Sequence, residues 1–185
     1  MLNDVVLALW FFAPAGFANV APVLAAAVPG MKNWSASIDG GRQFRGRPLL
    51  GPHKTWRGFA AGIFFATVIF WVQQQLVVQY EWAAWMAGDV PYTELSALMM
   101  GLLFALGALG GDAVESFFKR RRGLKSGASW VGFDQLDYII GAILFTLPIV
   151  QLSLVQYIWV IVMWFAIHII SSYAGWLMGL KKQPV

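Results

Sequence analysis

Long uncharged segments alternate with short polar segments along this chain. Residues 5–28, 58–80 and 95–111 contain no Asp, Glu, Lys or Arg. A helix that crosses the hydrocarbon core of a bilayer needs about 20 predominantly apolar residues, so each segment predicts one membrane span. Residues 138–180 also carry no formal charge, but they are too long for one span. They predict two spans joined by a turn near residues 151–156, where Gln151, Ser153 and Gln156 gather.

The first apolar segment has two further features. It contains Pro14 and Pro22, and a proline inside a helix removes a backbone hydrogen bond, so we expect this span to be kinked or locally unwound. The chain begins Met1-Leu2-Asn3-Asp4, with neither a basic region nor a small-residue cleavage site. These residues do not resemble a cleavable signal peptide, and the first segment is expected to be a retained span.

Composition indicates that lipid is the main solvent. Hydrophobic residues make up 59% and charged residues 12% of the 185 residues, against roughly 45–50% and about 25% in soluble proteins. We therefore expect an all-α, polytopic membrane protein with about five transmembrane helices, and a single domain over residues 1–185. The sequence contains no cysteine, which excludes disulfides, thiolate metal sites and cysteine nucleophiles.

The connecting segments alternate in charge. Residues 29–57 carry six Lys or Arg against one acid, residues 81–94 carry three acids and no base, and residues 119–133 carry five Lys or Arg and no acid. Cytoplasmic loops are enriched in Lys and Arg. The pattern predicts a plasma-membrane protein with its N-terminus outside, and with both basic loops and the C-terminus in the cytoplasm. The net charge of +4 is therefore assigned to topology and phosphate binding, and not to nucleic acid.

Acidic residues stand at the end of the third apolar segment. On a helix, Asp112, Glu115, Ser116 and Lys119 are spaced so that they share one face. A carboxylate at membrane depth costs about 2.5–3.5 kcal/mol on insertion scales, and a divalent cation would offset that cost. Mg²⁺ prefers a few carboxylates and keeps other positions for water and phosphate oxygens. The alternative is that Asp112 and Glu115 pair with Lys119 and Arg120 at the headgroup boundary.

A second acid pair, Asp134 and Asp137, begins the fourth apolar segment at the same membrane face. Its alternative interpretation is helix capping and compensation of the helix dipole. Between the two acid pairs lie the bases of residues 119–125. Acids for metal beside bases for phosphate indicate phosphoryl or nucleotidyl transfer, in which metals and cations neutralise the charge that develops at phosphorus.

The first basic loop adds candidate phosphate ligands. It is rich in glycine, which permits close approach of the backbone to a ligand, and Arg45, Lys54 and Arg57 supply donors. The loop could equally be a flexible tether or contact anionic lipid. His53 and His168 form no obvious metal pair, and either could be a structural histidine.

These motifs resemble two related enzyme families. Ser116, Lys119-Arg120, Lys125 and the closing acids Asp134 and Asp137 are similar to the signature of phosphatidate cytidylyltransferases, although Ser126 replaces the usual aspartate and a His-Gly-Gly stretch is missing. The CDP-archaeol synthase family is a closer match over nearly the whole chain. The similarity includes Asn19 and Pro22, residues 44–46 and 50–58, residues 111–121, residues 133–137, residues 168–173 and residues 179–181.

The resemblance implies a membrane enzyme with five spans and with two cytoplasmic loops that form the site. It implies cytidylyl transfer from CTP to an unsaturated ether-lipid phosphate, with Mg²⁺ as cofactor and CDP-lipid and pyrophosphate as products of phospholipid biosynthesis. We expect Mg²⁺ at Asp112, Glu115, Asp134 and Asp137. We expect Lys119 to act with these acids in catalysis, and substrate binding by Arg45, His53, Lys54, Thr55, Arg57, Ser116, Arg120 and Lys125.

Three other classes of protein fit the pattern less well. A transporter for a phosphorylated solute should show polar residues deep in several spans, and residues 58–80 and 138–150 are mostly apolar. A CDP-alcohol phosphotransferase needs a longer aspartate pattern that is not found in the sequence. A membrane scaffold has no need for two acid pairs at one depth.

Overall fold

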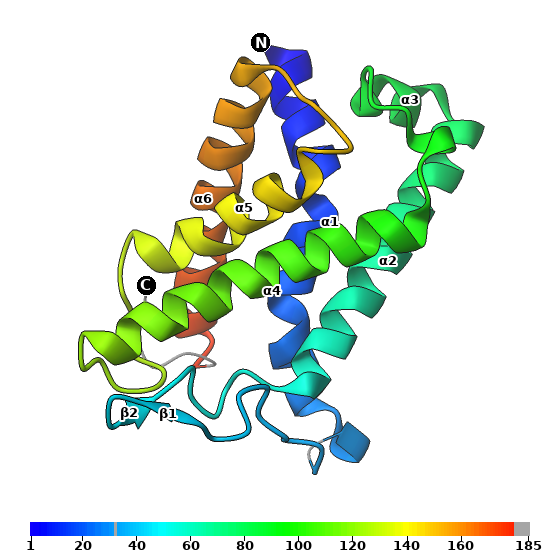
Figure 1. Ribbon diagram of the computed structural model, residues 1–185. Coiled ribbons are helices and arrows are strands. Elements are labelled where there is room, and N and C mark those ends of the chain that lie inside the picture. The colour runs from blue at the N-terminus through cyan, green and yellow to red at the C-terminus, as the bar shows by residue number, and fades with distance from the viewer. Residues whose placement is uncertain (32, 180–185) are drawn as a thin grey trace.

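The computed structural model describes residues 1–31 and 33–179. In chain order these residues form α1 (Leu2–Ala27), the 3-10 helix η1 (Pro29–Met31), β1 (Gln43–Phe44), β2 (Arg47–Pro48), α2 (Trp56–Gln79), α3 (Glu81–Ala87), the 3-10 helix η2 (Tyr92–Glu94), α4 (Ala97–Arg121), α5 (Phe133–Thr146) and α6 (Leu154–Leu177). The long helices form a bundle, with the β1–β2 hairpin at one end and α3 at the other (Figure 1). Among the described residues, the regular structure is therefore helical apart from one short hairpin.

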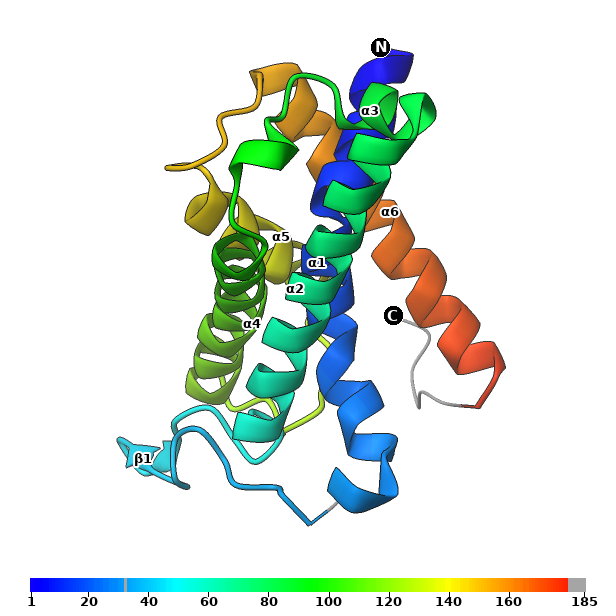
Figure 2. The same ribbon diagram turned by 90° about the vertical axis from the view of Figure 1, so that its right-hand side faces the viewer.

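Helix α1 forms the centre of the bundle and contacts α2, α4 and α6 (Figures 1 and 2). Phe11 and Phe12 of α1 meet the ring of Phe104 on α4 edge-on, with centroids 5.2 and 6.1 Å apart. Trp164 on α6 donates its indole N–H to the Ala8 carbonyl at 3.1 Å. Aromatic packing and one buried hydrogen bond thus hold both neighbours on α1.

The predicted membrane spans are confirmed in part. Among the described residues, α1, α2, α4 and α6 are long and apolar enough to cross a membrane. Helix α5 has 14 residues, or about 21 Å at 1.5 Å per residue, which is less than the hydrocarbon thickness of about 30 Å. The predicted break in residues 138–180 is confirmed, because α5 ends at Thr146 and α6 begins at Leu154.

Helix α1 is continuous from Leu2 to Ala27, so its two prolines do not unwind it. Pro22 packs closely against α2, since a Cβ at Gly58 of α2 would lie 3.0 Å from Pro22 Cβ. Thr55 caps α2, and its hydroxyl accepts from Gly58 N at 3.2 Å. These contacts fix where the first loop joins the bundle.

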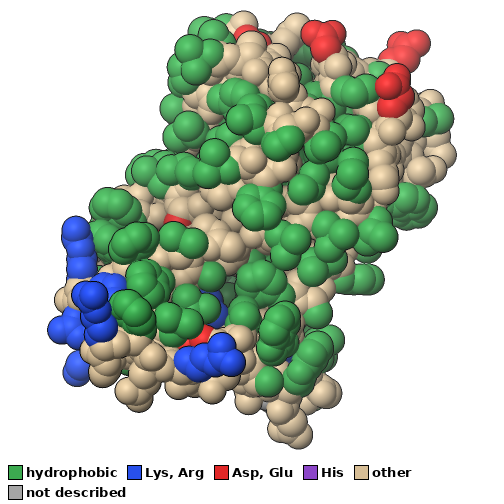
Figure 3. Space-filling model, viewed as in Figure 1, with side chains coloured by type: hydrophobic (Ala, Val, Ile, Leu, Met, Phe, Trp, Pro, Cys, Tyr) green, Lys and Arg blue, Asp and Glu red, His purple; other side chains and the backbone are tan. Residues whose placement is uncertain are grey.

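Polar groups inside the bundle bond to backbone carbonyls. On α2, Gln73 donates to Trp10 O at 2.6 Å, and Gln74 donates to Tyr92 O and Leu95 O at 2.6 and 2.7 Å. Many large apolar side chains of the spans are exposed on the outside, as expected of surfaces that face lipid. Lys and Arg gather at the hairpin end, and Asp and Glu gather at the α3 end (Figure 3).

Candidate active site

The site begins with a glycine-lined crossing of α4 and α5. A Cβ at Gly111 would lie 2.1 Å from Asp137 O, and one at Gly141 would lie 2.1 Å from Gly107 O. Real Cβ atoms do not approach so closely, so only glycine lets these two helices touch, as in small-residue packing of membrane helices. The contact sets Asp137 on α5 directly opposite the turn of α4 that carries the first acid pair.

Asp112, Glu115 and Asp137 form a carboxylate cluster at this crossing. Each offers one oxygen, and the three oxygens lie within 4.8 Å of one another. Glu115 is 6% exposed, so water screens its charge poorly. Three hard oxygen donors at this spacing suit a divalent cation that keeps its remaining positions for water or phosphate. The residues present therefore fit Mg²⁺.

Two lysines balance these acids. Lys119 Nζ lies 3.0 Å from Glu115 and also pairs with Asp134, and Lys54 Nζ lies 2.5 Å from Asp112. The second oxygen of Asp134 accepts from Trp130 N at 2.9 Å. Asp134 is thus turned toward Lys119 and lies outside the carboxylate group found among the described residues. Its predicted role as a metal ligand stays a prediction.

The alternative interpretation of the first acid pair is partly realised. Glu115 does pair with Lys119. Asp112 pairs instead with Lys54 of the first loop, and Arg120 donates to the carbonyl of Lys125 at 2.9 Å. Ion pairing and metal binding are compatible here, because a lysine can leave a carboxylate when a cation or a phosphate arrives.

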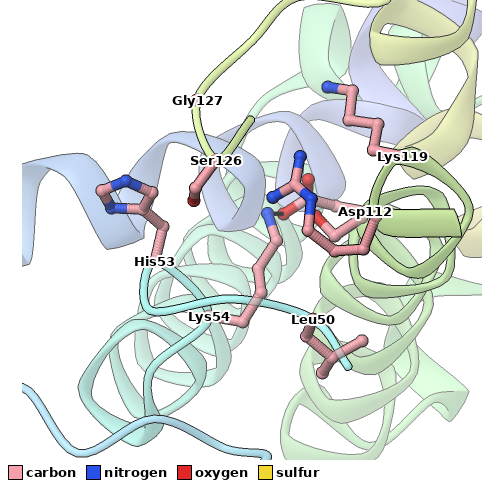
Figure 4. A pocket seen from close by; sticks show the side chains of 9 residues that line it. Leu50, His53, Lys54, Asp112, Lys119, Ser126 and Gly127 are labelled. Carbon is pink, nitrogen blue, oxygen red and sulfur yellow. Dashed lines mark hydrogen bonds and ion pairs between the residues drawn. The ribbon is translucent and has the colours of Figure 1, made fainter. Parts of the chain in front are cut away.

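The carboxylates and lysines open into adjoining cavities between the loops and the helix ends. A small cavity of about 180 Å³ is lined by Leu50, His53, Lys54, Asp112, Ser116, Lys119, Arg120, Ser126 and Gly127, and Figure 4 shows Lys54 reaching toward Asp112 inside it. A larger cavity of about 550 Å³ shares Lys54, Asp112 and Lys119 and extends to Asp134 and Asp137. The predicted loop and helix residues therefore meet in one place.

Four predicted substrate-binding residues have other surroundings. Thr55 caps α2, although it also borders a cavity of about 250 Å³ with His53 and Lys54. Arg57 donates to Met31 O at 2.7 Å. Arg45 borders a separate cavity of about 490 Å³ at the hairpin, and Lys125 receives Arg120 through its carbonyl. Their predicted contacts with substrate stay predictions.

Three residues that were not predicted to bind substrate also line the larger cavity. Asn19 comes from α1, and His168 and Ser172 come from α6 one helical turn apart. Isolated polar residues in apolar spans are functional candidates by default. That signal, and the four-residue spacing of the α6 pair, could have indicated them.

The hairpin is clasped to the end of α4 by reciprocal arginine contacts. Arg121 donates to the carbonyls of Phe44, Arg47 and Pro48, and Arg47 donates to the carbonyls of Arg120 and Arg121. The turn between the strands, Arg45-Gly46, has φ of 52° and 71°, as a tight two-residue hairpin requires. The hairpin is therefore held against the end of α4.

The fold and the site define a polytopic membrane enzyme that places acids and bases for phosphate chemistry at one end of its helices. The profile of the family described as CarS-like, CDP-archaeol synthase, matches residues 1–185. A CDP-archaeol synthase of Thermococcus kodakarensis is 38% identical over 184 residues, which cover 99% of this chain and 98% of the relative. One of Methanospirillum hungatei is 38% identical over 154 residues, covering 80% and 88%.

A solved structure agrees with the sequence matches. It is described as giving structural insight into an intramembrane enzyme for archaeal membrane lipids biosynthesis, and it aligns with a TM-score of 0.68 and 27% identity over 89% of this chain and 91% of that chain. The chain belongs to the CDP-archaeol synthase family. This assignment confirms the prediction of a CTP-dependent cytidylyltransferase in a multi-pass membrane protein.

Proposed function

We propose that the protein transfers the cytidylyl group of CTP to the phosphate of an archaeol-type ether lipid and releases pyrophosphate. An oxygen of the lipid phosphate attacks the α-phosphorus of CTP, and the bond from that phosphorus to the pyrophosphate oxygen breaks. The observation that carries this proposal is the carboxylate cluster of Asp112, Glu115 and Asp137 beside Lys54 and Lys119, in a chain that matches the family from end to end.

Each group has a role that follows from its surroundings. Asp112, Glu115 and Asp137 would hold Mg²⁺, which supplies Lewis-acid neutralisation of phosphate charge when bound. Lys54 and Lys119 bind and orient the phosphates, and Asp134 holds Lys119 in place through their ion pair. The lipid phosphate is already an anion near neutral pH, so the reaction needs no strong general base.

The roles of the cavities follow from their linings. The small cavity is bordered mainly by cations and hydroxyls, which suits phosphate groups. The larger one continues to Asn19 and Val23 on α1 and to His168 on α6. The side of this larger cavity that α1 and α6 border suits the lipid phosphate. A lipid substrate must arrive from between the spans, whereas CTP arrives from the side of the loops.

Topology can be refined from the chain path. Helix α5 rises from the hairpin end, and the segment from Leu147 to Ser153 continues to the end of the bundle where α6 begins (Figure 1). We propose that α5 and this segment together make the fourth crossing in chain order, which gives five crossings in one domain of residues 1–185. The membrane in this proposal is the plasma membrane, and the basic loops face the cytoplasm. The C-terminal tail carries two further bases, Lys181 and Lys182, which lie outside the described residues.

The function is tested with purified protein in detergent. The protein is incubated with CTP, Mg²⁺ and either archaeol-type or diacyl lipid phosphate, and both pyrophosphate and CDP-lipid are measured. We expect CDP-lipid in stoichiometric amount with pyrophosphate, faster turnover of the ether lipid, and poor use of ATP, because a pocket built to bond the cytosine edge leaves polar groups unpaired against a purine. Equal turnover of ATP would contradict the nucleotide assignment.

A further inference from the structure

Asp39 is a buried acid that the proposed reaction does not use. It is the one acid in residues 29–57, and it is 7% exposed. One carboxylate oxygen accepts from the Ser37 hydroxyl and from Gly41 N at 2.9 Å, and the other accepts from Leu50 N and Gly51 N at 2.9 and 3.2 Å. Burial raises the pKa of Asp39, but these hydrogen bonds outweigh it and lower the pKa to about 2.

These bonds join the two ends of the first loop. Beside Asp39, Ile38 N donates to Lys54 O at 2.8 Å and Trp56 N donates to Ala36 O at 3.1 Å. The chain entering the loop therefore runs antiparallel to the chain leaving it. Asp39 lies where this pairing ends, and its carboxylate accepts from three backbone donors, of which Gly51 N would otherwise be buried without an acceptor.

The segment that Asp39 binds, Leu50–Gly51, lies shortly before Lys54 in the chain. Gly51 has φ of 107°, and a Cβ there would lie 3.4 Å from Arg120 Nη1 and from Ser126 Oγ, so this turn rests on the rim of the site. Lys54 follows three residues later, and its N–H donates to Gly51 O at 3.4 Å. From that position its side chain crosses to Asp112 (Figure 4).

We propose that Asp39 is a positioning residue, whose carboxylate fixes the Leu50–Gly51 turn so that Lys54 is held over the site to receive the phosphates of CTP. Asp39 itself touches no phosphate. The inference rests on the proposed role of Lys54 as a phosphate ligand. Loss of the carboxylate frees the turn and lets the Lys54 ammonium sample positions away from Asp112. Because Lys54 contacts phosphate both before and during the reaction, the loss appears mainly in KM for CTP.

The test is a double-mutant cycle of Asp39→Ala and Lys54→Met. We expect Asp39→Ala to raise KM for CTP on the order of tenfold, the scale of having to order a loose loop side chain on binding. In the Lys54→Met background, Asp39→Ala should raise KM for CTP by less than about a further twofold, because the ammonium group that Asp39 positions is already absent. Full additivity would overturn the positioning role. A normal KM in Lys54→Met alone would instead refute the role of Lys54, so the two failures are distinguishable.

Folding is controlled within the same experiment. Asp39→Asn keeps a carbonyl acceptor in the same shape and should give a smaller increase in KM, and Asp89→Ala removes an exposed acid at the opposite end and should leave KM unchanged. Trypsin cleavage after Arg42 and Arg45 reports the loop directly. We expect faster cleavage in Asp39→Ala, with thermal stability of the bundle retained. A raised KM with unchanged cleavage would overturn the proposal.

Discussion

Lys54 and Asp112 are 58 positions apart in the sequence, and their side chains form an ion pair with 2.5 Å between Nζ and Oδ2. Both side chains are partly buried, at 19% and 27% exposure. The pair connects the first loop to α4 across the mouth of the cavity. Because Asp112 is also part of the carboxylate cluster proposed to hold Mg²⁺, Lys54 and the cation would compete for it in the absence of nucleotide.

This competition gives the first prediction. Lys54→Met should let Mg²⁺ alone bind more tightly, by about two- to fivefold, the scale of a partly exposed ion pair, while it weakens binding of CTP. The measurement is the Mg²⁺ concentration that gives half of the thermal stabilisation, without nucleotide. Lys54→Arg keeps the cation and serves as the control. A midpoint that moves to higher Mg²⁺ would show that Lys54 does not compete.

The second prediction separates the acids from one another. Asp112→Asn and Asp137→Asn keep size and remove one charge from the cluster, so turnover should fall on the order of 10²-fold, as for loss of one electrostatic contact in a transition state. The fold should survive, because the Lys54–Asp112 pair is partly exposed and such pairs stabilise little, and because an acidic charge near the bilayer is costly. Activity is assayed over a range of Mg²⁺ beside thermal stability, and activity should partly return at high Mg²⁺.

Asp134→Asn should behave differently, because Asp134 pairs with Lys119 and with Trp130 N. It leaves Lys119, which is 9% exposed, with a weaker partner, so thermal stability should fall and high Mg²⁺ should not restore activity. The alternative that the cluster acids are only structural predicts this pattern for Asp112 and Asp137 as well. A destabilised but active Asp112→Asn would therefore remove the metal role at that position.

Helix-face spacing in the sequence was enough to place Asp112 and Glu115 together, since i and i+3 share one side of any helix. It could not separate Asp134 from Asp137, because their directions depend on how α5 crosses α4 at Gly111 and Gly141. The spacing of Gly107 and Gly111 marks a close helix–helix contact in the sequence, but it does not say which helix packs there or in which direction that helix crosses. Lys54 was a candidate, but its meeting with Asp112 depends on the path of a whole loop.

The sequence contains a signal for the short length of α5, which the absence of charged residues does not show. Pro148 follows Thr146 closely, and proline cannot continue a helix interior. Counting uncharged residues alone therefore overestimated the helical part of the fourth span. Conversely, the prolines of α1 did not interrupt it, because packing against neighbouring helices can outweigh one missing hydrogen bond.

The third prediction concerns orientation, and the absence of native cysteine from the sequence makes it direct. Single cysteines at the exposed positions Ser35, Ser126 and Thr93 change little in size and remove no charge. A membrane-impermeant maleimide added to intact cells should label Thr93→Cys, and it should label the other two only after the cells are opened. Labelling of Ser35→Cys in intact cells would show that the first basic loop lies outside the cell and would contradict the predicted orientation.

The fourth prediction uses two adjacent glycines that differ only in their surroundings. A Cβ at Gly111 would lie 2.1 Å from Asp137 O, whereas at Gly110 nothing among the described residues lies within 4 Å of it. Gly111→Ala must push α5 away from α4, an overpacking cost of about 1–3 kcal/mol, and the shift moves Asp137 away from Asp112 and Glu115.

We expect Gly111→Ala to lower the melting temperature and to raise the Mg²⁺ concentration needed for half-maximal activity. Gly110→Ala replaces glycine in the interior of the same helix without a clash and should match or slightly exceed the wild-type melting temperature, since alanine favours helix. Both variants are measured in one detergent, with Mg²⁺ titrations at saturating CTP. If Gly111→Ala kept the wild-type Mg²⁺ requirement while its melting temperature fell, the crossing would serve stability alone, and the convergence of the carboxylates on one cation would lose its main structural support.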